Sequence, residues 1–157
     1  MTGRFPPKSP IRFTEMRRVA LASTKIDLNH SRIARVQDLD EVAQVLFSGN
    51  RHHQRIFLAV FVELKWAEGQ FLEALEPVAD KYGITRRSLE TVRAKMRRLG
   101  LIDHVSRFNQ KHGYREGWVF SNKFVHALEK LASLAVKFRE CRNAMQERKD
   151  RDLLSYL

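Results

Sequence analysis

The chain has 157 residues and a formal net charge of +11, with 29 lysines and arginines against 18 aspartates and glutamates. This length predicts one domain with extensions, and the single cysteine, Cys141, excludes an internal disulfide framework and suits the cytoplasm, where we expect the protein to reside. No run of about 18 apolar residues occurs and the first residues lack the apolar middle of a secretory signal, so we expect no membrane partner.

Residues 1–37 are strongly basic, with eight Lys and Arg residues against two acidic ones. The prolines and basic residues near the start predict a basic N-terminal arm. Residues 38–48 then indicate a short helix that ends at Gly49, because Asp38 is followed three residues later by Glu41, the spacing of a capping box.

From Asn50 we expect a longer helix that runs to about Trp66. The stretch IFLAVFVEL within it is apolar almost all round, so this helix must be buried on several sides. That is more burial than one small domain usually needs, and it indicates packing against a further element, which a second subunit could provide.

Residues 75–102 predict two helices joined by a tight turn. Pro77 suits the first turn of the first helix, where its missing N–H costs nothing. Gly83 suits the left-handed position that ends this helix, and Thr85 is placed to cap the next one.

The second helix, expected over residues 85–99, has one apolar side and one basic side. Its apolar residues recur at three- and four-residue spacing, so they share a buried face. They are Leu89, Val92, Met96 and Leu99. A DNA-binding helix-turn-helix presents such a polar outer side to a groove, and two core helices with a solvated basic face are the alternative.

A β-hairpin is expected after this helix, over residues 103–120. The residues up to 108 indicate one strand, residues 109–117 a polar tip that contains glycine, and residues 118–120 a return strand. Three basic side chains are assigned to the tip: Lys111, His112 and Arg115. A tip with these side chains is suited to bind phosphates or to enter a minor groove.

This pattern resembles the winged helix-turn-helix regulators, most nearly the MarR-type and PadR-type repressors. The resemblance covers about residues 51–140 and is carried by VADKYGITRRSLETVRAKMRRLGLI, by the hairpin and by VFSNKFVHALEKLASL. It implies a mainly α fold with a small β-hairpin wing and with N- and C-terminal helical extensions. The segment NQKHGYREGWVFS departs from the acidic residue and arginine of a MarR-type wing, so ligand class and regulatory logic are not carried over.

Positive charge is concentrated in the segments that would meet DNA. Residues 76–121 hold ten basic and five acidic residues, whereas residues 51–75 hold three of each. Neutralising phosphates with Lys and Arg releases counterions, which supplies much of the affinity for duplex DNA. The net charge alone fits a membrane-surface or RNA-binding protein equally well, and it is the distribution that favours duplex DNA.

We expect DNA contacts from the polar side of the second helix and from the hairpin tip. Arg86 and Arg87 are the candidates for reading guanine, with phosphate contact as the alternative. Glu90 could accept a hydrogen bond from cytosine or pair with a neighbouring arginine. Lys95 and Arg97 come later in the helix and are expected at phosphates or in solvent. The full set is Thr85, Arg86, Arg87, Ser88, Glu90, Thr91, Arg93, Lys95, Arg97, Lys111, His112 and Arg115.

Residues 122–157 are expected to form a long C-terminal helix that dimerises the chain. Ser121 can cap a helix that runs to about residue 149. Apolar residues along it alternate at four- and three-residue steps, which is typical of a coiled-coil seam. They are Phe124, Leu128, Leu131, Ala135, Phe138 and Met145. A dimer would engage two half-sites about 34 Å apart, and a helix packed on its own domain is the alternative.

No catalytic or metal-binding pattern is found, and we expect a protein that is not an enzyme and uses no cofactor. The six histidines lack the spacing of metal ligands. The sequence also lacks a phosphate-binding glycine loop, a nucleophile elbow and a paired acidic nuclease motif. A small-molecule effector stays open, although no residue identifies one.

The sequence therefore predicts a cytoplasmic, dimeric winged helix-turn-helix protein that binds duplex DNA as a transcriptional regulator. One alternative is a plasmid or phage replication or partition factor, which the basic N-terminal arm would suit. The other is a winged-helix protein-interaction module that does not bind DNA, and the basic outer face of residues 85–98 argues against it.

Overall fold

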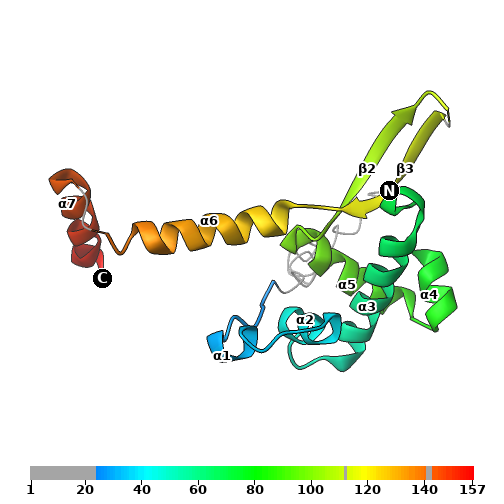
Figure 1. Cartoon of the computed structure of the whole chain (residues 1–157), viewed down its shortest axis with the longest axis horizontal. Helices are drawn as coiled ribbons and strands as arrows, with labels where there is room; N and C mark the ends of the chain where they lie inside the picture. Colours follow the sequence, from blue (N-terminus) through cyan, green and yellow to red (C-terminus); the bar gives the residue numbers. More distant parts are fainter. Residues whose placement is uncertain (1–23, 112, 141–142) are drawn as a thin grey trace, which may run out of the picture. The chain divides into compact units, whose positions relative to one another are not determined.

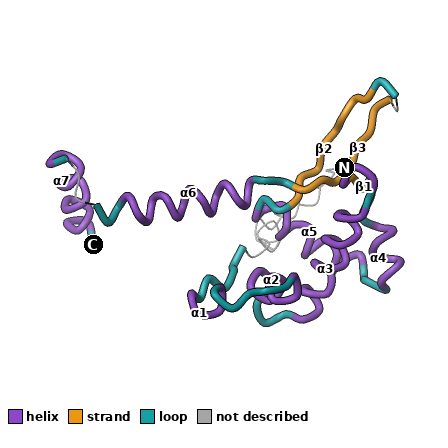
Figure 2. The backbone as a smooth tube through the Cα atoms, viewed as in Figure 1, coloured by secondary structure: helices purple, strands orange, loops and turns teal. Residues whose placement is uncertain are grey.

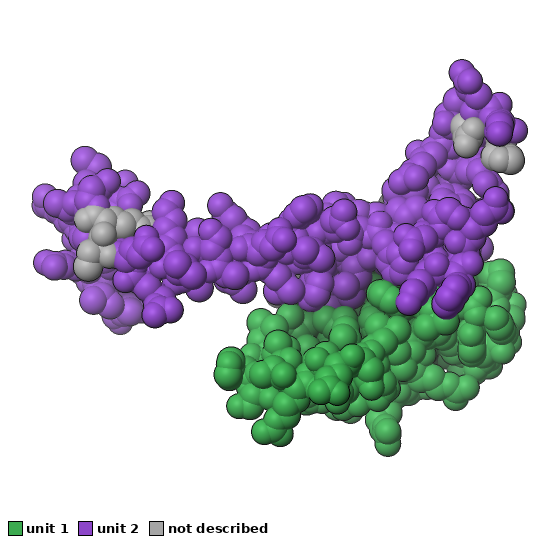
Figure 3. Space-filling model, viewed as in Figure 1, with its two compact units in different colours: residues 1–63, 75–98 green, residues 64–74, 99–157 purple. Residues whose placement is uncertain are grey.

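The computed structural model describes residues 24–111, 113–140 and 143–157. Within these ranges the chain is mainly helical and carries a three-stranded antiparallel sheet (Figures 1 and 2). It divides into two compact units: unit 1 comprises residues 1–63 and 75–98, and unit 2 comprises residues 64–74 and 99–157 (Figure 3). None of the helices in the described ranges combines the length and the apolar character that a bilayer span requires.

Unit 1 is helical. Its helices are α1 (His30–Ile33), α2 (Leu39–Leu46), most of α3 (Arg51–Trp66), α4 (Glu76–Tyr82) and all but the last residue of α5 (Arg86–Leu99). The helices α2 and α3 occupy the two segments predicted as helical between the arm and the first motif helix. The short helix α1 was not predicted, and the part of the arm before residue 24 lies outside the described residues.

Side-chain caps start α2 and α3. The Asp38 carboxylate accepts a hydrogen bond from the backbone N–H of Glu41 at 2.8 Å, as predicted. Asn50 performs the same function for α3, because its side-chain oxygen accepts from the backbone N–H of His53 at 3.0 Å. Each cap satisfies one of the N–H groups that the first turn of a helix leaves without a partner.

The core of unit 1 is formed by α2, α3, α4 and α5, which lie together in Figure 1. The Phe47 ring at the end of α2 lies 5.5 Å from the Phe57 ring in α3. Along α3 the apolar stretch is largely buried, whereas Leu58, Phe61 and Val62 stay half-buried, so the burial expected on all sides is only partly reached. Buried side chains of this core include Ala43, Leu46, Ile56, Val60, Val78, Ala79, Leu89, Val92 and Met96.

The tight turn between α4 and α5 is confirmed. Pro77 lies in the first turn of α4, and the helix ends at Gly83, which has φ 62° and ψ 38°. Glycine adopts this left-handed conformation without the steric cost that a Cβ brings. Thr85 Oγ1 accepts a hydrogen bond from the backbone N–H of Ser88 at 3.3 Å and so caps α5.

Unit 2 contains the sheet and the C-terminal helices. Its elements are the end of α3, the 3₁₀ turns η2 (Glu68–Gln70) and η3 (Leu154–Tyr156), the strands β1 (Phe71–Leu72), β2 (Ile102–Asn109) and β3 (Gly113–Phe120), and the helices α6 (Lys123–Lys137) and α7 (Ala144–Leu153). The strand order is β1-β3-β2, with β3 antiparallel to both neighbours. The strand β1 was not predicted.

The close approach of β1 to β3 depends on Gly117. In the register, Leu72 of β1 is the partner of Trp118, the residue after this glycine. A Cβ on Gly117 would lie 2.4 Å from the Leu72 carbonyl oxygen and 2.6 Å from the Phe71 ring. Any side chain larger than hydrogen at this position would therefore push the edge strand away.

The predicted hairpin is present, but its tip is shorter than expected. The expected tip covered residues 109–117, whereas Asn109 is already paired with Gly113 and the residues from Gly113 onward belong to β3. A two-stranded ribbon exposed to water on both sides tolerates the polar residues that suggested a loop. Arg115 consequently lies within β3, opposite Arg107.

The predicted long C-terminal helix is two helices. α6 ends at Lys137 and α7 begins at Ala144. Asn143 has extended backbone angles and its side chain accepts from the N–H of Gln146 at 3.0 Å, so it caps a new helix and does not continue the old one. The cap of α6 also differs from the prediction: Asn122 is its N-cap residue, although Ser121 Oγ accepts from the Lys123 N–H at 3.3 Å.

Candidate nucleic-acid interface

The polar side of α5 carries most of the predicted DNA-binding residues. Its apolar side is buried, with Leu89 1% exposed and Met96 fully buried. The predicted residues that the structure leaves exposed on α5 and its cap are Thr85, Arg86, Arg87, Glu90, Thr91 and Arg97. Ser88 and Arg93 are half-buried. The structure thus brings six of the predicted side chains onto one solvent-facing surface.

Some of these exposed groups are already engaged. Glu90 forms an ion pair with Arg93, one turn further along the helix, which agrees with the pairing alternative for this glutamate. Thr91 Oγ1 donates to the carbonyl oxygen of Arg87 at 3.0 Å. Within the described part of the chain, no carboxylate forms an ion pair with the guanidinium of Arg86, Arg87 or Arg97. Unpaired guanidinium groups on an exposed surface are suited to bind phosphates or guanine edges.

The expectation that Lys95 faces phosphates or solvent is wrong. Its side chain is only 9% exposed, and its ammonium donates to the carbonyl oxygen of Lys25 at 2.7 Å. Lys95 follows Val92 by three residues and precedes Leu99 by four, which is the spacing of the buried face. The spacing therefore indicated that Lys95 lies on the buried face, but its charge led to the prediction that it is exposed.

The three residues predicted at the hairpin tip do not all lie there. Arg115 is not at the tip: its guanidinium forms an ion pair with Glu73 at 3.2 Å and lies 5.5 Å from the centre of the Phe71 ring. Lys111 lies in the turn at the tip, as predicted, and is exposed. The prediction for His112 falls outside the described residues.

Two exposed aromatic residues near the tip were missed by the sequence analysis. Phe108 and Tyr114 are partners across the hairpin and are 79% and 65% exposed. The ribbon extends beyond the short strand β1, which pairs with β3 only at Trp118 and Val119 and so does not reach the far end (Figure 2). The two strands are longer than the available apolar residues could cover. This mismatch is the signal in the sequence that could have identified Phe108 and Tyr114 as exposed.

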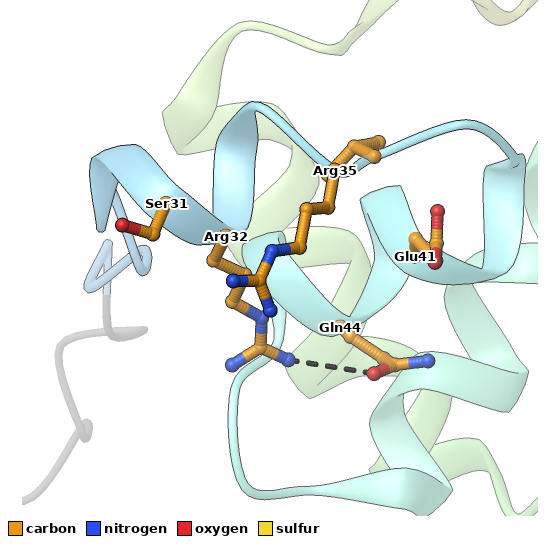
Figure 4. Close-up of a pocket in the computed structure, with 6 residues that line it drawn as sticks. Ser31, Arg32, Arg35, Glu41 and Gln44 are labelled. Atoms are coloured by element: carbon orange, nitrogen blue, oxygen red, sulfur yellow. Dashed lines mark hydrogen bonds between the residues drawn. The ribbon is translucent and has the colours of Figure 1, made fainter.

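The sequence analysis also missed a basic cavity in unit 1, because residues 1–37 were interpreted only from their net charge. It has a volume of about 240 Å³ and lies between α1 and α2. Figure 4 shows Arg32 and Arg35 extending toward Gln44. The Arg32 guanidinium pairs with Asp27 at 2.8 Å and contacts the Gln44 side-chain oxygen at 3.4 Å, whereas Arg35 has no ion-pair partner among the described residues.

The described residues contain no group of three or more His, Cys, Asp or Glu side chains that could hold a metal ion. Comparison of the chain with protein-family models, with curated proteins and with solved structures gave no match.

Proposed function

We propose that this chain binds duplex DNA through the exposed side of α5, as a winged helix-turn-helix transcriptional regulator. The observation that carries the proposal is the division of α5 into a buried apolar side and an exposed side on which Arg86, Arg87 and Arg97 lack ion-pair partners in the described chain. A helix of 14 residues fits the major groove, where arginine can bind guanine through two hydrogen bonds. In this proposal α5 is the recognition helix.

The β2–β3 hairpin is the proposed wing. It follows α5 in the chain and carries exposed Arg107 and Lys111 together with the Phe108–Tyr114 pair. Basic side chains bind the phosphates that flank a minor groove, and apolar side chains can enter such a groove or contact its sugars. Arg115 is left out of the proposed contacts because Glu73 already neutralises it.

We infer that α6 pairs with the same helix of a second copy. None of its residues is buried within the described chain. Its seam positions nevertheless keep the alternating four- and three-residue steps of a two-stranded coiled coil from Phe124 to Phe138. Met145 is removed from the predicted seam because it belongs to α7. A second copy fits such a self-complementary face and would supply the second reading head.

Binding of a random-sequence duplex by the full chain, followed by fluorescence anisotropy at low and at high salt, tests the proposal. We expect binding at low salt that weakens steeply as salt rises, because phosphate contacts release counterions. Replacing Arg86 and Arg87 together by alanine is expected to weaken binding at least about tenfold. It is also expected to reduce the slope of log K against log salt by up to about 1.8, at about 0.9 for each lost phosphate contact.

The matched control is the double variant Arg148→Ala/Lys149→Ala, which removes the same charge from exposed positions in α7. We expect it to bind DNA nearly as well as the unmodified chain. Equal losses in the two double variants would mean that only net charge matters and that α5 is not the binding surface. No binding of any duplex at low salt would reject the proposal altogether. Sequencing of genomic fragments bound by the chain then separates a regulator, found at promoters, from a replication or partition factor.

A further inference from the structure

A second basic cavity in unit 1 lies where α5 meets the end of α2 and the start of α3. Its volume is about 170 Å³, enough for a small anion or for several water molecules at about 30 Å³ each. The lining residues are Lys25, Phe47, Ser48, Asn50, His53, Thr91 and Lys95. None of these seven lining residues is acidic, and Lys95 and His53 bring a cationic and a titratable side chain to the cavity.

Lys95 is the unusual member of this group. Its side chain is 9% exposed, and its ammonium lies 2.7 Å from the Lys25 carbonyl oxygen and 4.6 Å from the centre of the Phe47 ring. An ammonium group has three donors, and these two neighbours supply one acceptor and one aromatic face. No carboxylate in the described chain forms an ion pair with it. A buried cation that has no counterion costs free energy.

The surroundings of the cavity are held in place by the fold. The Gln54 side chain donates to the Phe47 carbonyl oxygen at 2.9 Å and fixes the end of α2. The segment that carries Lys25 is tied to α2, because the backbone N–H of Asp27 donates to the Val45 carbonyl oxygen at 2.9 Å. Lys95 itself extends from α5, whose other buried residues form the core. The positive charge is therefore fixed at this position by the packing of the unit.

The pKa values of two lining groups respond to this environment. Burial lowers the pKa of Lys95. The pKa of His53 is also lowered, first by burial and then by the charges of His52 and Lys95. Positive charge at these two positions therefore carries a free-energy penalty. A bound anion would remove this penalty and raise both pKa values.

We propose that this cavity binds an oxyanion of the phosphate type, with Lys95 as its principal charged ligand. Charge-assisted hydrogen bonds from a buried ammonium are among the stronger polar contacts in proteins. His53, Asn50 and Ser48 bring further hydrogen-bonding groups to the same cavity. Thr91 belongs both to the lining and to the exposed side of α5, so the cavity borders the proposed recognition surface.

The oxyanion has two available sources: a phosphodiester of bound duplex or a free molecule that carries phosphate. The first source rests on the proposed function, whereas the phosphate site itself does not. The primary experiment therefore uses inorganic phosphate alone, added to the full chain at constant ionic strength made up with chloride. Isothermal titration calorimetry and the thermal unfolding midpoint are recorded together, because a ligand that binds only the folded state raises that midpoint.

We expect saturable phosphate binding and a rising midpoint for the unmodified chain. In Lys95→Met, which keeps the length of the side chain without its charge, the dissociation constant is expected to increase at least about tenfold. This variant should fold, because it replaces a buried charge by an apolar group, and its midpoint without phosphate should be equal or higher. His53→Ala provides a second variant of the same cavity, with a smaller expected loss. Lys130→Met, which removes an exposed lysine from α6, is the matched control and should bind phosphate normally.

Either of two outcomes would overturn the proposal: an unmodified chain that does not bind phosphate saturably, or equal phosphate binding by Lys95→Met and Lys130→Met. A salt titration of duplex binding then identifies the source. If a DNA phosphate occupies the cavity, Lys95→Met lowers the slope of log K against log salt by about 0.9 and inorganic phosphate competes with the duplex. If the source is a free molecule, the slope is unchanged. Phosphate binding without any duplex binding would retain this proposal while rejecting the proposed function.

Discussion

The helices α5 and α6 have the same kind of apolar spacing in sequence, but the apolar face of α5 is buried and that of α6 is not. In α5 the apolar residues at three- and four-residue spacing are buried, with Leu89 1% exposed. In α6 the same spacing leaves the helix without a single buried residue, and Leu131 is 56% exposed. The polar side of α5 faces water because its apolar side is buried within the chain, whereas the apolar side of α6 contains no buried residue in the described chain.

The spacing of apolar residues therefore predicts which face of a helix is apolar, but it does not predict what covers that face. The apolar face of α5 is buried in unit 1, in the core that this helix forms together with α2, α3 and α4. In α6, by contrast, Phe124 and Leu128 near the beginning of the helix are only half-buried, and no residue of the helix is buried. We propose that DNA covers the polar face of α5 and that a second copy of the chain covers the apolar face of α6.

Alanine substitution of one leucine in each helix gives the largest expected contrast. Leu89→Ala is expected to lower the free energy of unfolding by about 2–5 kcal/mol, because it removes a fully enclosed side chain and leaves a cavity. Leu131→Ala, measured at a protein concentration low enough to favour the monomer, is expected to cost no more than about 0.5 kcal/mol. Urea denaturation of both variants measures the two values. Equal losses at every protein concentration would mean that α6 is packed within the chain.

A charge placed on the apolar face of α6 tests its proposed partner directly. Leu131→Asp is expected to weaken self-association at least about tenfold, or about 1.4 kcal/mol, because each copy would have to bury a carboxylate in the seam. Sedimentation velocity over a range of concentrations measures the change. Ser133→Asp adds the same charge to the same helix outside the seam and is expected to leave association unchanged. A dimer that survives Leu131→Asp would place the interface elsewhere.

Much of the fold was predictable because its signals are local. The caps at Asp38 and Thr85 and the left-handed glycine at Gly83 act within a few residues, and each was confirmed. The break between α6 and α7 also has a local signal, since Asn143 followed by Gln146 is a capping pattern. The coiled-coil spacing across the break nevertheless led to the prediction of one continuous helix. The strand β1 could not be predicted, because two residues acquire a strand conformation only from pairing with β3, about 47 residues later in the chain.

The exposure of candidate site residues was predicted correctly where it follows from helical spacing. It was predicted wrongly where the charge of a side chain was taken as evidence that the side chain is exposed. Arg86 and Arg87 lie on the outer side of α5 as the spacing requires. Lys95 has inward spacing, and its ammonium donates to the carbonyl oxygen of Lys25, 70 residues away, and lies over the Phe47 ring. Arg115 is engaged by Glu73 in the same long-range way. Contacts over such sequence separations cannot be read from periodicity.

Substitution of the N-cap residues of α5 and α6 is expected to give a smaller difference in stability. Thr85→Ala is expected to cost about 1 kcal/mol of stability, because the hydroxyl accepts the Ser88 N–H at the start of α5. Asn122→Ala at the start of α6 is expected to cost less, because the Asn122 side chain makes no capping hydrogen bond. Chemical denaturation of the two variants gives the comparison. If Asn122→Ala lowers stability more than Thr85→Ala does, the start of α6 depends on a contact of Asn122 other than a capping hydrogen bond.

The smallest expected effect is a difference in response to acid. Glu63 Oε1 accepts from Lys81 Nζ and from the Tyr82 hydroxyl, each at 2.6 Å, and the hydrogen bond from Lys81, followed by that from Tyr82, lowers the pKa of Glu63 below its usual 4.5. Between the lowered pKa and 4.5 the folded chain binds fewer protons than the unfolded chain, so stability rises with pH in that window. The contribution is complete above about pH 4.5 and is lost as the pH falls through the folded pKa.

Glu63→Gln is therefore expected to flatten the acid limb of the stability profile, measured as the urea midpoint between neutral and acidic pH. The matched variant in α6 is Glu129→Gln, whose carboxylate lies 3.4 Å from His126 with both side chains largely exposed. Water screens such a surface pair, so its removal should leave the profile close to that of the unmodified chain. Coincident profiles for Glu63→Gln and the unmodified chain would mean that the contact between α3 and α4 contributes nothing to the stability of the unit that positions α5.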